Sequence, residues 1–515
     1  MLDCPDTFSI LKSVLLEFWE TEITPDQWEV GLLKILAKKG DLSQAGNYRG
    51  IVLLETVYKI AAIIMHDRLQ PVVESIDHEE QCGFRPQRGC SDGIFTVKLA
   101  IKKRREHGLE TWVMFLDLVK AFDRVPRQAL WEVLRKFGVP PKIIRLLQSL
   151  HADVTVKFTV CDVTHTLYCT IGVKQGDILG PTLFTFYIAA IMITWRASHE
   201  RPLCLYRTKM DGTLTGRRYT ARGEEFAVSD SEYADDTAVL FPSREDLDDG
   251  VPKVMAHFAR WGMEIHTGNK AITPPKESKT EILFVSKPEK MYSNRDTYDD
   301  ADLSDISLGQ EGVYIPVVDK FCYLGSWITR NGRDDVDVDA RIVKAGAAFG
   351  ALRKPVFGSL KISMHAKKLV YSRLVLPVLL YGSDIWCLTE KSLNKLRLFH
   401  ARCIRAMCRV TLRHTRTHRI TTGVLLERVG LPPIDNLVTM NLLRWAGHVM
   451  RMGSSRLPRK LMTSWVREPR PRGCPQFTYG RGIYKALRNM DVAKEEWYEK
   501  SQCRDDWREM INSLK

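Results

Sequence analysis

The chain has 515 residues, which is enough for several domains and an ample core. Its 76 Lys and Arg residues outnumber 62 Asp and Glu residues, and the net charge of +14 favours a polyanionic partner. The N-terminal segment has acids before its apolar run and no small-residue cleavage site, which excludes a signal peptide, and the longest apolar runs are too short to span a membrane. We therefore expect a soluble intracellular protein without a membrane partner, whose 12 scattered cysteines are mostly reduced core residues.

The first half of the chain alternates predicted helices and strands. Residues 31–40 and 49–54 read as short strands, and a helix near residue 100 carries the basic run 102–105, which we interpret as a solvated helix face. The apolar strand 111–117 ends in Asp117. A strand pair within 154–172 and a helix over about 177–199 follow.

The second half turns mainly helical. Residues 200–230 contain glycines typical of a loop or hairpin, and the acidic stretch 289–312 resembles an exposed insertion. Beyond 321–329 the pattern is helical to the end, so the fold class is α+β with a helical C-terminal region. Between residues 401 and 482 there are 16 Lys or Arg against three acids, a local net of +13 that is suited to binding phosphates.

Two adjacent carboxylates are the first candidates for chemistry. Asp-Asp occurs five times, but only Asp235-Asp236 lies between apolar segments, at a tight turn that predicts the tip of a hairpin. Burying both charges is costly unless a cation lies between them. If the strand ending in Asp117 is a neighbour in the same sheet, three carboxylates converge at one edge. That set suits two Mg²⁺ ions, with Mn²⁺ as a substitute, in phosphoryl transfer.

A second constellation has zinc-ligand residue types, at Cys403, Cys408, His414 and His418. The gap between the two cysteines is at the long limit for zinc, and the gap from Cys408 to His414 is far shorter than in zinc fingers. The alternative is a basic helix with Cys403 and Met407 on its apolar side. The spacing favours this helix and leaves zinc binding open.

Residues 28–329 resemble the reverse transcriptase of non-LTR (LINE-type) retrotransposons in seven blocks that follow the family's order. The blocks are WEVGLLKILAKKGDLSQAGNYRGIVLL, QCGFRPQRGCSD, FLDLVKAFDRV, GVKQGDILGPTLF, YADD, SKTEILF and FCYLGSWIT, and the similarity continues in LPVLLYGSDIWCLT and LLRWAGHVMRM. The resemblance implies a right-hand polymerase with fingers, palm and thumb and a basic helical C-terminal extension. The implied divisions are 1–110 for an N-terminal extension and fingers, 111–285 for the palm, 286–320 for the acidic insertion, 321–400 for primer grip and thumb, and 401–515 for the C-terminal region.

The resemblance assigns roles to the carboxylates and to two basic residues. It makes Asp117, Asp235 and Asp236 the ligands of the metal ions, with Asp236 the least direct. Arg49 and Lys38 match fingers positions that can close on a triphosphate, where arginine offers a bidentate contact and lysine a point charge. Ordinary surface charge is the alternative for both, and it has more weight for Lys38.

Four further residues receive roles at the nucleotide. Gln175 and Gly176 match a turn that approaches the incoming nucleotide, where a Cβ at Gly176 would obstruct the approach. Lys279 matches a lysine that could protonate the departing pyrophosphate. Phe122 matches an aromatic residue that excludes the 2'-hydroxyl of ribonucleotides, although a phenylalanine at such a turn is also commonly core packing.

The resemblance implies an RNA-directed DNA polymerase that extends a DNA 3'-hydroxyl on an RNA template. Its partners would be an RNA template, a DNA primer or target and deoxynucleoside triphosphates, and an active retroelement would place it in the nucleus. Residues 177–181, DILGP, depart from the usual Cys-Pro-Leu-Ser-Pro. We see no nuclease segment, so we expect a partial element or one that takes its nick from elsewhere. A catalytically idle, nucleic-acid-binding relic is the alternative, and a group II intron maturase resembles the chain less well.

Overall fold

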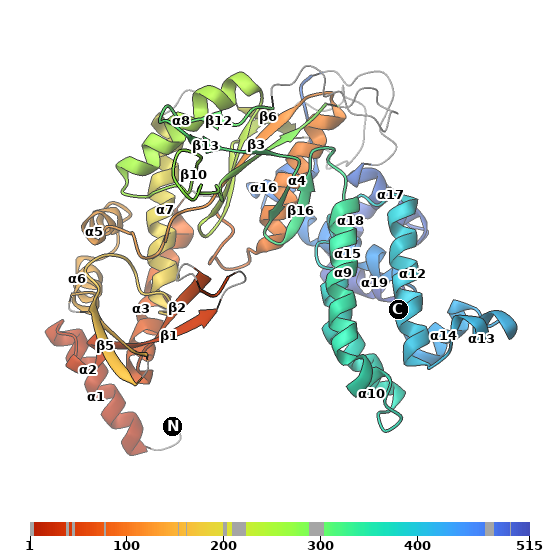
Figure 1. Cartoon of the computed structure of the whole chain (residues 1–515), viewed down its shortest axis with the longest axis horizontal. Coiled ribbons are helices and arrows are strands. Elements are labelled where there is room, and N and C mark those ends of the chain that lie inside the picture. The colour runs from red at the N-terminus through yellow and green to blue at the C-terminus, as the bar shows by residue number, and fades with distance from the viewer. Residues whose placement is uncertain are drawn as a thin grey trace.

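The computed structural model describes residues 5–37, 41–43, 47–76, 79–152, 154–160, 162–198, 203–208, 223–287, 303–468, 478–494 and 496–514. In Figure 1 a central sheet lies at the top, a smaller sheet with α1 to α3 lies at the left, and the helices α9, α10 and α12 to α14 lie at the right. None of the helices among the described residues combines the length and apolar composition needed to cross a lipid bilayer.

The central sheet is built around β3 (Thr111–Leu116), all of whose residues are buried. Its strand order is β14-β11-β3-β9-β8, and β3 is antiparallel to both of its neighbours. The other strands are β8 (Asp230–Tyr233), β9 (Asp236–Phe241), β11 (Glu281–Val285) and β14 (Val317–Val318). A short continuous apolar run is consistent with a strand that is covered on both faces, which explains the sequence of β3.

Successive side chains of β3 enter two different cores, because a strand points alternate residues to opposite faces. Trp112, Met114 and Leu116 join the core made with α7 (Leu179–Ser198) and α8 (Arg244–Arg260). Val113 and Phe115 join the core made with α4 (Cys90–Glu106) and the C-terminal helices. The last group comprises α15 (Ile434–Met450), α16 (Leu457–Met462), α17 (Tyr479–Arg488), α18 (Trp497–Gln502) and α19 (Arg504–Asn512).

The smaller sheet has the order β2-β1-β4-β5, and the strands predicted from the sequence are confirmed. They are β1 (Val30–Ala37), β2 (Tyr48–Leu53), β4 (Thr155–Val160) and β5 (Val163–Tyr168). The helices of this part are α1 (Pro5–Thr21), α2 (Asp26–Glu29), α3 (Thr56–Ser75), α5 (Arg127–Lys136) and α6 (Pro141–Leu150). Helix α3 packs on α7 and so connects this sheet to the central one.

The remaining strands form three short sheets. Of the loop or hairpin predicted within 200–230, the structure shows two antiparallel strands, β6 (Cys204–Thr208) and β7 (Glu225–Val228), which join β17 (Ser464–Trp465). The others are β10 (Gly268–Asn269), β12 (Ile306–Ser307) and β13 (Val313–Ile315), and the hairpin β15 (Lys320–Tyr323) with β16 (Ser326–Thr329). Residues 288–302 of the predicted acidic insertion lie outside the described residues.

A third core joins the helices between β16 and α15. They are α9 (Asp335–Leu352), η2 (Arg353–Phe357), α10 (Met364–Val370), η3 (Tyr371–Val375), α11 (Leu376–Leu379), α12 (Glu390–Met407), α13 (Leu412–Thr417) and α14 (Thr422–Val429). The mainly helical pattern predicted beyond residue 329 is therefore confirmed.

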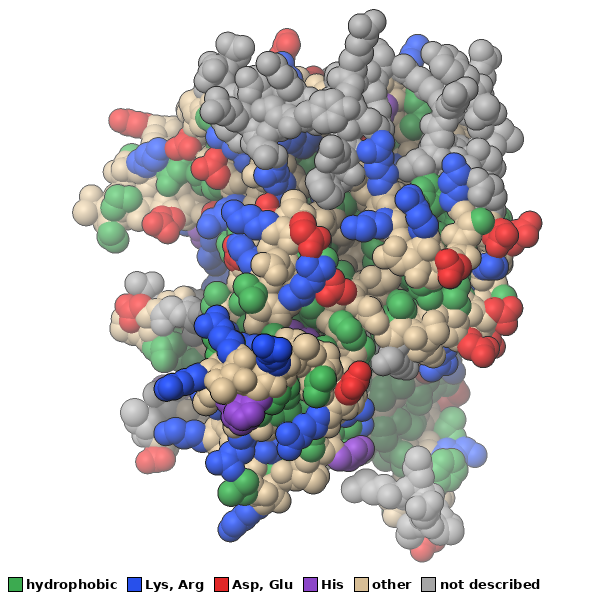
Figure 2. Space-filling view, turned by 90° about the vertical axis from the view of Figure 1, so that its right-hand side faces the viewer, with side chains coloured by type: hydrophobic (Ala, Val, Ile, Leu, Met, Phe, Trp, Pro, Cys, Tyr) green, Lys and Arg blue, Asp and Glu red, His purple; other side chains and the backbone are tan. Residues whose placement is uncertain are grey.

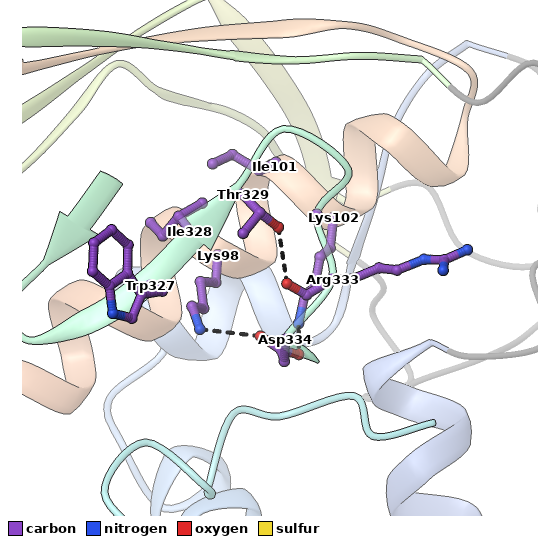
Figure 3. Close-up of a pocket in the computed structure, with 9 residues that line it drawn as sticks. Lys98, Ile101, Lys102, Trp327, Ile328, Thr329, Arg333 and Asp334 are labelled. Atoms are coloured by element: carbon purple, nitrogen blue, oxygen red, sulfur yellow. Dashed lines mark hydrogen bonds and ion pairs between the residues drawn. The ribbon is translucent and has the colours of Figure 1, made fainter. Parts of the chain in front are cut away.

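The prediction of a solvated face for the basic run of α4 is wrong. Lys102 Nζ donates to Asp334 Oδ2 at 2.6 Å, and Lys98, one turn earlier, donates to Asp334 Oδ1 at 3.0 Å (Figure 3). Lys98 also reaches Asp337 Oδ2 at 3.3 Å, and Arg104 is buried with its guanidinium on Thr111. Burial opposes ionisation of Asp334, but Lys102 and Lys98 outweigh it and hold its pKa well below the ordinary value. These pairs fasten α9 to α4.

Candidate active site

Three carboxylates lie at one end of the central sheet. Asp117 directly follows β3, and Asp236 is the first residue of β9. The pairing of β3 with β9 ends at Leu116 and Thr237, so Asp117 and Asp236 are the next residues outward on the two strands. Asp235 lies in the turn between β8 and β9. The two strands are therefore neighbours, as the sequence argument required.

The carboxylates act on one another electrostatically. Burial and then the Asp235 and Asp117 carboxylates raise the pKa of Asp236 to about 6. Burial also raises the pKa of Asp235, with a further increase from Asp117 and an opposing effect of Arg49. Ionising all three groups together is therefore unfavourable, and a cation among them would relieve the repulsion.

The backbone of Asp117 is held by two residues that the sequence argument missed. Its N–H donates to Thr280 Oγ1 at 3.2 Å, and its carbonyl accepts from His266 N at 2.8 Å. Both partners precede β11, the other neighbour of β3. For Thr280 the signal is the strand 281–285, whose pairing with β3 brings the residue before it close to Asp117. His266 lies there through a separate bridge between Leu118 and Ile265, which that strand does not predict.

Lys279 lies at the same end of the sheet. Glu281 pairs with Phe115, so Lys279 lies level with Asp117 if the register is continued by two residues. Its N–H donates to His266 Nδ1 at 3.2 Å, and its side chain is exposed. Burial, with the charges of Lys276 and Lys279, lowers the pKa of His266. The Lys279 ammonium thus lies within electrostatic reach of the carboxylate end.

Arg49 approaches the carboxylates from the smaller sheet. It is exposed on β2, and its charge is one of the groups that lower the pKa of Asp235. Lys38 lies outside the described residues, directly after β1 ends at Ala37.

Gln175 and Gly176 connect the start of α7 to β2. The carbonyl of Gln175 accepts from Val52 N at 2.9 Å. Gly176 has φ of +106°, and an added Cβ would lie 2.7 Å from Val52 O. Only glycine fits this conformation and this approach. In this structure the neighbour that excludes a side chain is therefore the β2 backbone.

Phe122 takes part in a row of aromatic rings. It is half-buried and stacked on Phe184 of α7, with centroids 4.7 Å apart and planes at 19°. Phe84, which is exposed, meets it edge-on at 6.5 Å. One face of the ring is thus packing, while the side chain retains access to solvent beyond Asp117.

The Cys and His constellation is spread over two environments. Cys403 and Met407 are buried in the apolar core of α12, whereas His414 and His418 are exposed and stacked on each other at 4.1 Å. This is the arrangement that the helical interpretation predicted. Within the described part of the chain, no three His, Cys, Asp or Glu side chains are already grouped as ligands of one metal ion.

Comparison with known proteins places the carboxylate end in a family. Residues 36–271 match the model described as "Reverse transcriptase (RNA-dependent DNA polymerase)". The RNA-directed DNA polymerase from mobile element jockey of Drosophila melanogaster is 25% identical over 463 residues, 87% of this chain and 44% of that protein. The probable RNA-directed DNA polymerase from transposon X-element of the same organism is 24% identical over 413 residues, 77% of this chain and 39% of that protein.

A more distant solved structure is apo telomerase from Candida tropicalis, with a TM-score of 0.39 and 10% identity over 90% of this chain and 74% of that one. The chain spans less than half the length of the curated relatives named above. The α+β class predicted from the sequence agrees with the sheets and helices of the structure, and the predicted resemblance is confirmed by the family match. Residues 36–271 thus match the reverse transcriptase family, and the relatives that match over a longer part of the chain are named as proteins of non-LTR retrotransposons.

Proposed function

We propose that the chain is an RNA-directed DNA polymerase that extends a DNA 3'-hydroxyl on an RNA template. The observation that carries the proposal is the meeting of Asp117, Asp235 and Asp236 at one end of paired strands. Raised pKa values at Asp235 and Asp236 are typical of carboxylates that are built to share a cation.

The donor set fits Mg²⁺, with Mn²⁺ as a substitute, because carboxylate oxygens are the preferred ligands of both ions. Asp117 and Asp235 would be the principal ligands, and Asp236 would be the least direct. Two such ions would activate the primer hydroxyl and neutralise the leaving pyrophosphate.

The residues around the carboxylates would orient the nucleotide. Arg49 and Lys38 would bind the triphosphate from the side of the smaller sheet, and Gln175 with Gly176 would form the floor at the start of α7. Lys279, whose side chain is exposed, would deliver a proton to the departing pyrophosphate. Phe122 would exclude the 2'-hydroxyl of a ribonucleotide. The 111–285 segment would serve as palm, residues 1–110 as fingers, and 321–400 as primer grip and thumb.

The template and primer would lie along a basic surface on α12 to α14. Figure 2 shows Lys and Arg side chains gathered with histidine on the lower part of this face. Six arginines here are exposed and form no salt bridge with any of the described residues: Arg402, Arg409, Arg413, Arg416, Arg419 and Arg428. Other arginines of the basic C-terminal region serve the fold, since Arg456 pairs with Glu79 at 2.6 Å and with Asp92 at 2.8 Å. An active retroelement protein of this kind would work in the nucleus.

Primer extension tests the proposal directly. The full chain with poly(rA), oligo(dT), dTTP and Mg²⁺ should extend the primer, and Asp117→Asn or Asp235→Asn should abolish extension while template binding persists. Asp249→Asn is the matched control, because Asp249 belongs to another Asp-Asp pair, exposed on α8. Binding without extension by the unaltered chain would mean an idle, nucleic-acid-binding relic instead.

A further inference from the structure

Gln81 lies against the turn that carries Asp235. Its side chain is fully buried, and its segment runs beside β8 through a parallel bridge between Gln81 and Glu232. Backbone hydrogen bonds fix this segment: Cys82 N donates to Glu232 O at 2.8 Å, and Glu232 N donates to Glu80 O at 3.0 Å. The loop that contains Gln81 is thus an additional edge of the central sheet.

The Gln81 amide binds both backbone groups of Ala234. Oε1 accepts from Ala234 N at 2.9 Å and from Gly83 N at 2.7 Å. Nε2 donates to Ala234 O at 3.3 Å and to Glu232 Oε2 at 3.3 Å. Only a side chain with a donor and an acceptor at this separation can make all four contacts.

The residue held in this way is the strained one of the turn. Ala234 has φ of +58°, in the left-handed region that alanine rarely occupies and that persists only when the surroundings enforce it. Asp235 follows directly, and Asp236 one residue later. The conformation of Ala234 therefore sets the direction in which both carboxylates leave the turn.

Gly83 allows the Gln81 loop to lie in direct contact with Ala234. A Cβ at Gly83 would lie 2.4 Å from Ala234 N and 3.0 Å from Gln81 Oε1. The first is shorter than real carbon contacts allow and the second is tight, so a glycine is required for the loop to lie directly against the turn.

We propose that Gln81 is a positioning residue of the polymerase site, whose amide holds Ala234 left-handed and so orients Asp235 and Asp236 toward the metal ions. The inference rests on the proposed function. A purely structural alternative is that Gln81 only pairs with the buried Glu232, whose pKa is raised by burial and by Asp230. The two differ in outcome, because the alternative leaves the carboxylates unaffected in a folded variant.

The first test compares Gln81→Met with the unaltered chain by measuring kcat, KM for dTTP, Mg²⁺ dependence, template-primer affinity and Tm. Met fills the space without hydrogen bonds. We expect kcat to fall at least tenfold and half-maximal Mg²⁺ to rise severalfold, while template-primer affinity stays within twofold. Gln70→Met is the matched control, because Gln70 is a glutamine of α3 whose Oε1 is buried. If kcat and half-maximal Mg²⁺ of Gln81→Met stay within twofold of the unaltered chain, or if Gln70→Met loses as much kcat, the inference is overturned.

The second test uses Gln81→Glu, which remains decisive if the methionine variant does not fold. In its ionised form the introduced carboxylate keeps the acceptor oxygen for Ala234 N but has no donor, and in its protonated form it regains one. The ratio of the variant's kcat to that of the unaltered chain should rise as pH falls from 8 to 6. A flat ratio would contradict the positioning role.

A third readout separates this inference from the proposed function. Mn²⁺ binding, followed by the electron paramagnetic resonance of the free ion, needs no catalysis. We expect Gln81→Met to bind Mn²⁺ at least fivefold more weakly than the unaltered chain. Equal Mn²⁺ affinity would refute the role of Gln81 even if extension is observed. Weaker Mn²⁺ binding in a chain that does not extend primers would instead refute the proposed polymerase function.

Discussion

Asp236 has two neighbouring acids, and its titration gives a prediction. Its folded-state pKa of about 6 lies above the ordinary 3.8, so folding favours the protonated form. Without divalent cations, stability should therefore decrease as pH rises from about 4 to about 6 and stay lower above that. Asp236→Asn should remove this decrease. Urea unfolding in EDTA at pH 4.5 and 7 measures it, and an unchanged pH dependence in the variant would contradict the assignment.

Gly176 offers a test of backbone strain. Gly176→Ala should destabilise the fold by about 1–3 kcal/mol, because alanine must adopt φ of +106° beside Val52 O. The KM for dTTP should rise as the turn moves away from β2. Gly350→Ala in α9 is the control, since a Cβ there meets nothing within 4 Å and alanine favours helix. Similar unfolding free energies for the two variants would show that the turn adjusts freely.

Phe122 can be tested as a gate against ribonucleotides. Phe122→Val should raise ribonucleotide incorporation far more than it lowers deoxynucleotide incorporation, because the ring would no longer fill the space of a 2'-hydroxyl. Its stacking on Phe184 also predicts some loss of stability. Phe137→Val is a packing control, since Phe137 contacts Phe186 of the same helix. Equal loss of both substrates with a lower Tm would leave Phe122 with a packing role alone.

For single residues, the sequence predicts a functional role well when the residues next to it in the chain already mark the position as unusual. Asp117 ends an apolar strand and Asp235-Asp236 interrupts another, so both stood out. Gln81 did not, because its partner Ala234 is 153 residues away and a loop glutamine has no local signature. The requirement for glycine at position 176 also could not be explained from nearby sequence, because the backbone that excludes a side chain belongs to β2, much earlier in the chain.

Helix α4 shows how an element can be predicted in position and still misread. Its helical pattern is visible, but the partners of Lys98 and Lys102 lie more than 230 residues further along. A basic run is normally solvated, and no local feature marks these lysines as interior. Tertiary ion pairs with Asp334 and Asp337 allow these lysines to lie in the interior instead of in solvent.

The buried pairs of α4 predict a large effect for one substitution. Lys98→Met should destabilise the protein by about 3–5 kcal/mol, because it leaves buried carboxylates with less compensation. Lys253→Met is the control, since Lys253 pairs with Asp249 on the surface of α8 and should lose less than about 1 kcal/mol. Urea unfolding of both variants measures the difference. A loss at Lys98 no greater than at Lys253 would mean that the pair contributes little.

At the scale of the molecule, the C-terminal region is part of the central core. Residues of α15 to α19 share a core with Val113 and Phe115 of β3, so removing everything beyond residue 401 would open this core. Truncation therefore cannot test nucleic-acid binding, although the charge distribution of the sequence suggests it. Composition gives the net charge of this region, but it cannot show which of the basic residues lie on the surface and which lie in the interior, because that depends on packing.

Substitution of the exposed arginines is the suitable test. Replacing Arg413, Arg416 and Arg419 of the α13 region by glutamine should weaken RNA–DNA duplex binding. The salt dependence of log affinity should flatten by about 0.9 for each phosphate that the protein no longer neutralises. A control replaces three exposed cations elsewhere: Arg135, Lys136 and Arg260. An unchanged salt slope in the α13 variant would mean that this surface binds something else.

The core that β3 shares with the C-terminal helices can be completed only late in synthesis of the chain. β3 leaves the ribosome early, but the helices that cover Val113 and Phe115 end only at Asn512. At roughly 5–20 residues per second, roughly 20–80 s separate the two events. During that interval α4, which is made before β3, covers that apolar face without the C-terminal helices, so part of the face stays open to a chaperone or to the ribosome surface. A message cut short before the last helix would yield a protein in which this core stays incomplete.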